Sequence, residues 1–269
     1  MLAAGALHAA WNALAKATSD PYAGFALIGA GQAVIGLVCL GFVTAPAPAS
    51  WPWLGASIIV HVVYLSLLAA SYRVGDFSQM YPLARGSAVL FSGSVAIAVI
   101  GERFGGSQLL GLAAITAGLL ALAVPAARSG PRGPWTALAT GVSIAAYTIL
   151  DGVGVRLSGD PLGYAAWLFA GLGPVAIGWA LLLRGRGLLD AVAVQWRTGM
   201  GAGVISTLSY GAVIVVQSMA PLAAVAALRE TGVVVSLVIG AVVFRERVTP
   251  GRVAAACAVV AGVMVFQLA

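Results

Sequence analysis

The sequence has too few charged residues for an ordinary soluble domain. Only 8% of its 269 residues are charged, whereas 61% are hydrophobic. Soluble domains carry about 25% charged residues, which keep their surfaces in contact with water. The mean hydropathy is +1.02. The composition therefore predicts an integral membrane protein that is surrounded by the lipid bilayer.

Cysteine and histidine are also scarce, with two of each. Cys39 and Cys257 lie in apolar segments, and we interpret them as small buried hydrophobic residues. Neither a CxxC pair nor a Cys/His spacing typical of a metal site is present. We therefore expect no metal and no cofactor.

The net charge of +6 has a simpler explanation than nucleic-acid binding. The Lys and Arg residues are scattered at the ends of apolar runs and form no basic stripe. Loops beside membrane spans carry such charges because they set the orientation of the protein. We expect no nucleic-acid partner.

Ten apolar runs are long enough to be considered as membrane spans. About 20 apolar residues cross the roughly 30 Å hydrocarbon core as a helix. The breaks between runs contain turn residues, as in Ser19-Asp20-Pro21. We predict an all-α integral membrane protein with ten transmembrane helices at about 2–17, 22–44, 53–73, 77–100, 106–124, 134–156, 161–183, 197–219, 221–244 and 250–268.

The two halves of the chain resemble each other. YAGFALIGAGQAVIG from Tyr22 matches YAAWLFAGLGPVAIG from Tyr164, and GERF from Gly101 matches RERV from Arg245. Residues 1–124 and 134–269 would each hold five spans, joined by a linker at 125–133. An odd number of spans inverts the second copy, and inverted repeats place substrate near the midplane between them.

The matching glycines in these runs are expected to bring helices close together, because small residues drive packing in lipid. They comprise Gly29, Gly31 and Gly36 in the first copy and Gly171, Gly173 and Gly178 in the second.

Two arginines occupy equivalent positions inside apolar runs. The repeat register aligns Arg85, in LARGSAVLFS, with Arg229, in ALRETGVVVS. Each lies about nine residues, roughly 13 Å, inside its span. An arginine there costs about 2.5–3.5 kcal/mol unless it meets water or an acid. The pair either holds the halves together or lines a central pathway and binds an anionic group.

Glu230 follows Arg229 directly and has two interpretations. It either neutralises Arg229 or carries a coupling proton. Glu102 and Glu246, in GERF and FRERV, lie where spans end. We expect them to pair with Arg103 or Arg247, or to cap the next helix, and so to be structural.

Further polar and aromatic residues recur on the first, third, sixth and eighth segments of the two copies. His8, Trp11 and Asn12 share one helix face, and Tyr81 lies one turn before Arg85. The alternative is that these are packed, hydrogen-bonded residues. The predicted substrate-binding set is Arg85, Arg229, Glu230, Tyr81, Tyr64, Tyr210, Trp11, Asn12, Tyr147 and His61.

These features resemble the drug/metabolite transporter superfamily, in particular ten-span members built from two EamA domains. The resemblance is carried by the five-plus-five repeat, by GERF at Gly101, FRERVT at Phe244, HAAWN at His8 and YPLARG at Tyr81. It implies a transport function. It does not give the substrate, because superfamily members move amino acids, sugars, nucleotide-sugars and drugs.

The charge distribution and the resemblance disagree about orientation. Alternate loops, starting after the first segment, carry most of the cationic residues, whereas the opposite side has Arg103 and Arg156. The positive-inside rule puts the richer side in the cytoplasm and both termini outside, which we favour. The resemblance implies termini inside. The richer side holds Lys16, Arg73, Arg128, Arg132, Arg184, Arg186, Arg197, Arg245, Arg247 and Arg252.

We therefore expect a secondary transporter, and an exporter, of a small polar metabolite that is anionic or zwitterionic, such as an amino acid. No Walker A sequence is present, so the chain is not expected to hydrolyse ATP. Efflux of cationic drugs is an alternative, and an intramembrane lipid-modifying enzyme is another, although a catalytic constellation is lacking. Arg-rich, Ala- and Gly-rich composition suggests a bacterial inner membrane, with the protein as a monomer or homodimer.

Overall fold

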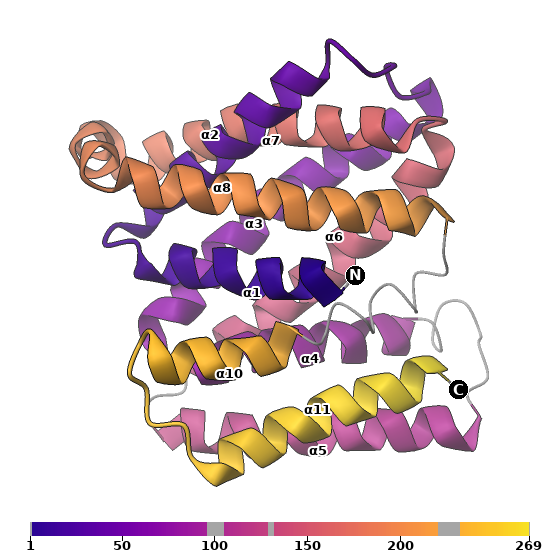
Figure 1. The fold of residues 1–269 in the computed structure, drawn as a ribbon, viewed down its shortest axis with the longest axis vertical. Helices are drawn as coiled ribbons and strands as arrows, with labels where there is room; N and C mark the ends of the chain where they lie inside the picture. Colours follow the sequence, from indigo (N-terminus) through magenta and orange to yellow (C-terminus); the bar gives the residue numbers. More distant parts are fainter. Residues whose placement is uncertain (1, 96–104, 129–131, 220–231, 269) are drawn as a thin grey trace.

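The computed structural model describes residues 2–95, 105–128, 132–219 and 232–268, and the statements below concern these residues. Within these ranges all regular structure is helical, and no strand occurs. The helices run roughly side by side (Figure 1). Five segments are long and apolar enough to cross a membrane: Pro21–Cys39, Pro48–Val74, Gly106–Ala123, Arg132–Leu157 and Pro161–Met219.

Helices lie at all ten predicted segments, although two helices are short. The one that begins the chain has 16 residues, and the described part of the ninth segment has 11. The elements are α1 (Leu2–Ala17), α2 (Pro21–Cys39), η1 (Pro48–Ser50), α3 (Trp51–Val74), α4 (Phe77–Val95), α5 (Gly106–Arg128), α6 (Arg132–Leu157), α7 (Pro161–Arg184), η3 (Gly185–Gly187), α8 (Leu188–Met219), α10 (Gly232–Val242) and α11 (Pro250–Leu268).

Several boundaries differ from the sequence-based prediction. Helix α2 ends at Cys39 rather than at 44. Helix α8 begins at Leu188 rather than at 197, because the residues before a kink at Gln195 are also helical. Between the halves, α5 continues to Arg128 and α6 begins at Arg132, so most of the predicted linker is helix.

Aspartates start two of the helices, α2 and α7. Asp20 caps α2 by accepting hydrogen bonds from the backbone N–H groups of Tyr22 (2.9 Å) and Ala23 (3.1 Å). Asp160 caps α7 by accepting from Leu162 N at 3.0 Å. In both cases proline follows at the first helical position, where its missing N–H costs no hydrogen bond.

Glycines allow α2 and α7 to pack closely. A Cβ atom on Gly36 would lie 2.5 Å from Ala170 N, and one on Gly173 would lie 2.7 Å from Gly29 O. The predicted packing role is therefore confirmed for these positions. It is wrong for Gly178, where a Cβ would meet no atom within 4 Å.

The remaining helices pair in a regular pattern. Helix α3 packs against α6, and α8 packs against α1. Helix α5 packs against α11, where Gly111 and Gly262 meet backbone to backbone. The outer surface exposes large apolar side chains such as Leu182 (80% exposed) and Val194 (82%). An apolar surface of this kind is stable in lipid rather than in water.

The cysteines do not lie in the core as expected. Cys39 is half-buried and Cys257 is exposed. Both occupy the outer face of their helices, where lipid can accommodate a small apolar side chain as well as a protein core can.

One end of the bundle gathers cationic loop residues. Lys16, Arg184 and Arg252 all make ion pairs there, at the junctions α1–α2, α7–α8 and α10–α11. Helix α1 begins and α11 ends at the opposite end (Figure 1).

Candidate functional site

A small cavity lies in the middle of the bundle, between six helices. Its volume is about 20 Å³, and a cavity of this size holds about one water molecule. The centre is therefore closed in this conformation, and a larger ligand requires the helices to move. The lining residues are His8, Trp11, Gln32, His61, Tyr64, Leu65, Tyr147, Leu172, Ser206 and Tyr210.

Aromatic rings form most of the cavity wall. The His61 ring stacks on Tyr147 with centroids 4.1 Å apart, and Tyr147 contacts Tyr64 (5.3 Å) and Tyr210 (5.5 Å) edge-on. Trp11 reaches Tyr64 at 6.4 Å. The structure thus brings five residues of the predicted binding set together around one cavity.

Two polar atoms in this wall have no hydrogen-bond partner in the described parts of the chain. They are Nε1 of Trp11 and Oε1 of Gln32. The amide nitrogen of Gln32, Nε2, donates to Ser206 Oγ at 3.1 Å, and this hydrogen bond fixes the orientation of the amide. A buried polar atom without a partner costs about 1–3 kcal/mol. The cavity therefore offers one donor and one acceptor to a ligand.

Asn12 lies outside the cavity lining. Its Nδ2 donates to the His8 carbonyl, and its Oδ1 accepts from the Tyr72 hydroxyl, both at 2.8 Å. The amide thus joins α1 to α3, and this arrangement supports a structural role.

Arg85 and Tyr81 are buried on α4, with exposures of 1% and 2%. They are outside the cavity lining given above, but the Tyr81 ring lies 6.4 Å from that of His8, which belongs to the lining. Arg229 and Glu230 fall within 220–231, and Glu102 falls within 96–104; both ranges lie outside the described residues. Their roles stay predictions.

The predicted binding set omits three polar residues in this region. Gln32 and Ser206 line the cavity, and Asp151 lies beside it with its side chain fully buried. Asp151 accepts hydrogen bonds from Tyr164 (3.0 Å) and Tyr210 (2.5 Å). Asp151 could have been found as the single acidic residue within its predicted span.

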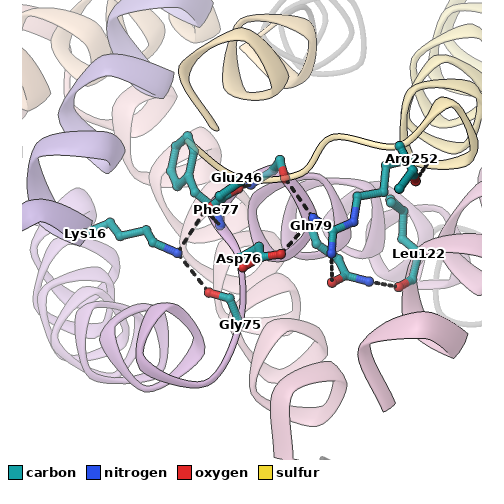
Figure 2. A network of polar contacts seen from close by, with 10 residues as sticks. Lys16, Gly75, Asp76, Phe77, Gln79, Leu122, Glu246 and Arg252 are labelled. Atoms are coloured by element: carbon teal, nitrogen blue, oxygen red, sulfur yellow. Dashed lines mark hydrogen bonds and ion pairs between the residues drawn. The ribbon is translucent and has the colours of Figure 1, made fainter. Parts of the chain in front are cut away.

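Glu246 has a different partner from the one predicted. Its carboxylate accepts from the backbone N–H groups of Phe77 (2.6 Å) and Ser78 (2.8 Å), and Lys16 Nζ lies 3.2 Å away (Figure 2). It therefore caps α4 rather than α11, and pairs with Lys16 rather than Arg247. Loop folding brings it to a helix start that is distant in sequence.

The surroundings of Glu246 keep it charged. Burial alone would raise its pKa, but the hydrogen bonds from Ser78 and Phe77 and the charge of Lys16 hold the pKa below its usual value. Nearby, Arg252 donates to Asp76 at 2.7 Å and to Ser78 Oγ at 3.3 Å (Figure 2). This polar network ties the start of α4 to α1 and α11.

A wider opening lies at the same end of the bundle. This vestibule has a volume of about 500 Å³ and is lined by Lys16, Arg73 and Arg184 together with Asp20 and Tyr72, among others. Burial raises the pKa of Asp20, but the hydrogen bond from Arg184 and those from Ala23 and Tyr22 more than offset it.

Shared residues connect the vestibule with the central cavity. A second small cavity of about 10 Å³ includes Tyr72 of the vestibule and Leu65 of the central cavity, along with Phe25 and Leu68. The route between α1, α2 and α3 is therefore closed by a few apolar and aromatic side chains.

Comparison with known proteins supplies the context for this site. The pattern of the EamA-like transporter family matches residues 131–268. A chain from a solved crystal structure is similar over 99% of this chain and 95% of its own length, with 15% identity and a TM-score of 0.63. That likeness concerns the fold alone. No curated protein matches.

Proposed function

The chain belongs to the EamA-like transporter family, and we propose that it is a secondary transporter which exports a small anionic or zwitterionic metabolite, such as an amino acid, by alternating access. It is a multi-pass membrane protein, and members of this family are transporters rather than enzymes. We place it in a bacterial inner membrane.

One observation carries the proposal for the substrate class. The central cavity holds a donor, Trp11 Nε1, and an acceptor, Gln32 Oε1, both buried and without partners in the described residues. A carboxylate would accept from the indole N–H, and an ammonium group would donate to the amide oxygen. The aromatic wall would favour the same ammonium group through cation–π contact.

The helix pairing supports an inverted repeat of residues 1–124 and 134–269. Under such a repeat, α1 corresponds to α6 and α3 to α8, so the packing of α3 on α6 repeats as α8 on α1. Both pairs contribute to the cavity wall. A site between two inverted copies can open to either side when the copies rock against each other. We propose ten spans on this basis.

The vestibule gives the solute an approach from one side. Its Arg73, beside the ion-paired Lys16 and Arg184, would raise the local concentration of anions. The positive-inside rule places this cationic end in the cytoplasm and the termini outside. An anionic metabolite would therefore enter the exporter here and reach the cavity once Leu65, Leu68 and Tyr72 move aside.

We retain Arg85 and Arg229 as residues that meet the anionic group in another conformation. Arg85 is nearly fully buried on α4, two helical turns after the start of that helix, where a charge is costly in lipid. Glu230 stays a candidate for neutralising Arg229.

A second candidate is efflux of a cationic compound. The aromatic wall around His61 and Tyr147, with the buried Asp151 behind it, favours a positive charge. This observation keeps cationic dyes among the compounds to be tested.

A ligand-stabilisation screen tests the proposal. Thermal unfolding of the purified protein is measured with amino acids, organic acids, phosphonates and cationic dyes. We expect anionic or zwitterionic compounds to raise the midpoint, and Gln32→Leu to remove the effect of the zwitterions. Stabilisation by dyes alone would replace the proposal with the second candidate.

A further inference from the structure

Asp151 on α6 is a buried acid that the proposed binding step leaves unused. Its side chain is fully buried, and its two oxygens accept hydrogen bonds from different helices. Oδ1 accepts from Tyr164 on α7, and Oδ2 accepts from Tyr210 on α8. A carboxylate at this depth needs such donors, because an unpaired charge inside a membrane protein is costly.

The two tyrosines that hold Asp151 differ in one respect. Tyr164 packs against α6, where a Cβ on Gly154 would lie 2.5 Å from its hydroxyl. Tyr210 also lines the central cavity. A tyrosine hydroxyl has a single hydrogen to donate. Tyr210 can therefore donate to Asp151 or to a solute in the cavity, but not to both.

We infer that Asp151 binds a proton that moves together with the solute, and that Tyr210 links the two; this inference rests on the proposed transport function. When an anionic group of the solute takes the Tyr210 hydrogen bond, Asp151 keeps only the donor on Tyr164. A buried carboxylate with a single donor is costly, and a bound proton removes its charge. By reciprocity, protonation of Asp151 frees Tyr210 for the solute.

Water on one side of the membrane supplies the proton, and water on the other side accepts it. Asp151 takes a proton where the solute enters and returns it where the solute leaves, and the O–H bond of the carboxyl is the one that forms and breaks. Export of an anion with a proton is then driven by the outward gradient of the solute itself.

Other titratable groups face this part of α6. From α3 come His61 and Tyr64, whose rings contact Tyr147 on α6 itself. The His61 ring lies 5.4 Å from that of Tyr210, and its Nδ1 lies 2.9 Å from the Ser57 carbonyl. His61 is therefore the competing proton carrier, and the test includes it.

The cationic residues lie farther along the helices. Arg156 follows Asp151 by five residues and is exposed. Arg85 on α4 lies close to Gly141 on α6. A Cβ atom on Gly141 would lie 2.7 Å from the carbonyl oxygen of Ala84, the residue before Arg85. Gly141 is ten residues before Asp151, or roughly 15 Å along α6. Helix α5 brings no titratable side chain between Gly106 and Ala123.

Infrared difference spectra between acid and alkaline pH test the proton site without a solute. The full-length protein is measured in liposomes as wild type, Asp151→Asn and Asp160→Asn, the last being a matched change in a loop. We expect a protonated-carboxyl band in wild type and Asp160→Asn that is missing from Asp151→Asn. The same band in all three proteins would overturn the inference.

Transport with a pH gradient tests the link through Tyr210. The probe is a radiolabelled mixture of the twenty amino acids, offered to proteoliposomes with acid outside or acid inside. Wild type should accumulate label when the outside is acid. Asp151→Asn should exchange label at zero gradient but lose this accumulation. Tyr210→Phe, which also loses its hydrogen bond to the solute, should lose the accumulation and exchange label more weakly, whereas Tyr164→Phe should retain part of the accumulation.

Results that would contradict the proton inference differ from results that would contradict the proposed substrate class. Accumulation driven by acid inside, or loss of accumulation in His61→Asn with Asp151→Asn unaffected, would contradict the inference. If wild type neither exchanges nor accumulates the probe, the proposed substrate class is wrong, and the infrared spectra alone decide whether Asp151 binds the proton.

Discussion

Lys16 on α1 and Glu246 in the loop between α10 and α11 form an ion pair, with Nζ 3.2 Å from Oε1. The same carboxylate caps α4, so one side chain joins three distant parts of the chain at the end where the vestibule opens. If this end opens during transport, this contact is among those that must break.

Glu246→Gln should lower stability although the side chain keeps its shape. The variant loses the charge that accepts from two backbone N–H groups and from Lys16, and loss of a helix cap costs about 1 kcal/mol. Unfolding in detergent measures the change. Asp190→Asn, an exposed acid at the start of α8, is the control, and equal stability of the two variants would contradict the capping role.

The same interaction predicts a pH dependence. The folded pKa of Glu246 is below its ordinary value of 4.5, so the unfolded chain binds more protons in the acidic range. The stabilisation is therefore present above about pH 4.5 and is lost as the pH falls through the lower folded value. We expect the stability difference between wild type and Glu246→Gln to be constant near neutral pH and to shrink in acid. A difference that grows in acid would contradict this sign.

Gly36→Ala and Gly178→Ala form a matched pair on α2 and α7. A Cβ at Gly36 would lie 2.5 Å from Ala170 N and 2.7 Å from Ala166 O, whereas one at Gly178 meets nothing within 4 Å. Overpacking against backbone costs about 1–3 kcal/mol, while alanine in an open helical position gains up to about 1 kcal/mol. Unfolding midpoints should fall for Gly36→Ala and hold or rise for Gly178→Ala. Equal effects would refute the close packing.

The sequence predicts the helices well because apolar length and turn residues act locally. Asp20-Pro21 and Asp160-Pro161 start helices where their patterns indicate, and Gly36 packs as its repeat suggests. Contacts between distant segments are harder to predict from the sequence. Nothing local to Glu246 indicates that it caps α4, because that depends on how two loops meet.

The lining of the central cavity was predicted only in part for the same reason. Periodicity placed Trp11, Tyr64 and Tyr147 on inward faces, and they meet at the cavity. Gln32 was overlooked because its counterpart in the repeat is Pro174, so no recurrence marked it. Asn12 shares the face of Trp11, yet its hydrogen bonds are used by His8 and Tyr72.

Trp11→Phe should weaken solute binding while preserving the aromatic wall. It removes the indole N–H that has no partner in the described residues. Loss of one hydrogen bond to a charged group costs about 1.5 kcal/mol, or roughly tenfold in Kd. Titration of a stabilising compound from the screen measures this. Trp179→Phe is the control, since its N–H donates to Ser66 Oγ at the exposed surface, and unchanged affinity in Trp11→Phe would contradict the site.

Counterflow in proteoliposomes tests the transport function most directly. Vesicles loaded with unlabelled amino acids receive the labelled mixture outside, with wild type, Arg85→Ala and Arg229→Ala compared at equal amounts of folded protein. We expect wild type to show saturable, transient accumulation of label, and both arginine variants to show none. Wild-type rates in both variants would contradict the role of the arginines. Linear, non-saturating flux, or flux equal to that of empty liposomes, would contradict the assignment of wild type as a secondary transporter of these solutes.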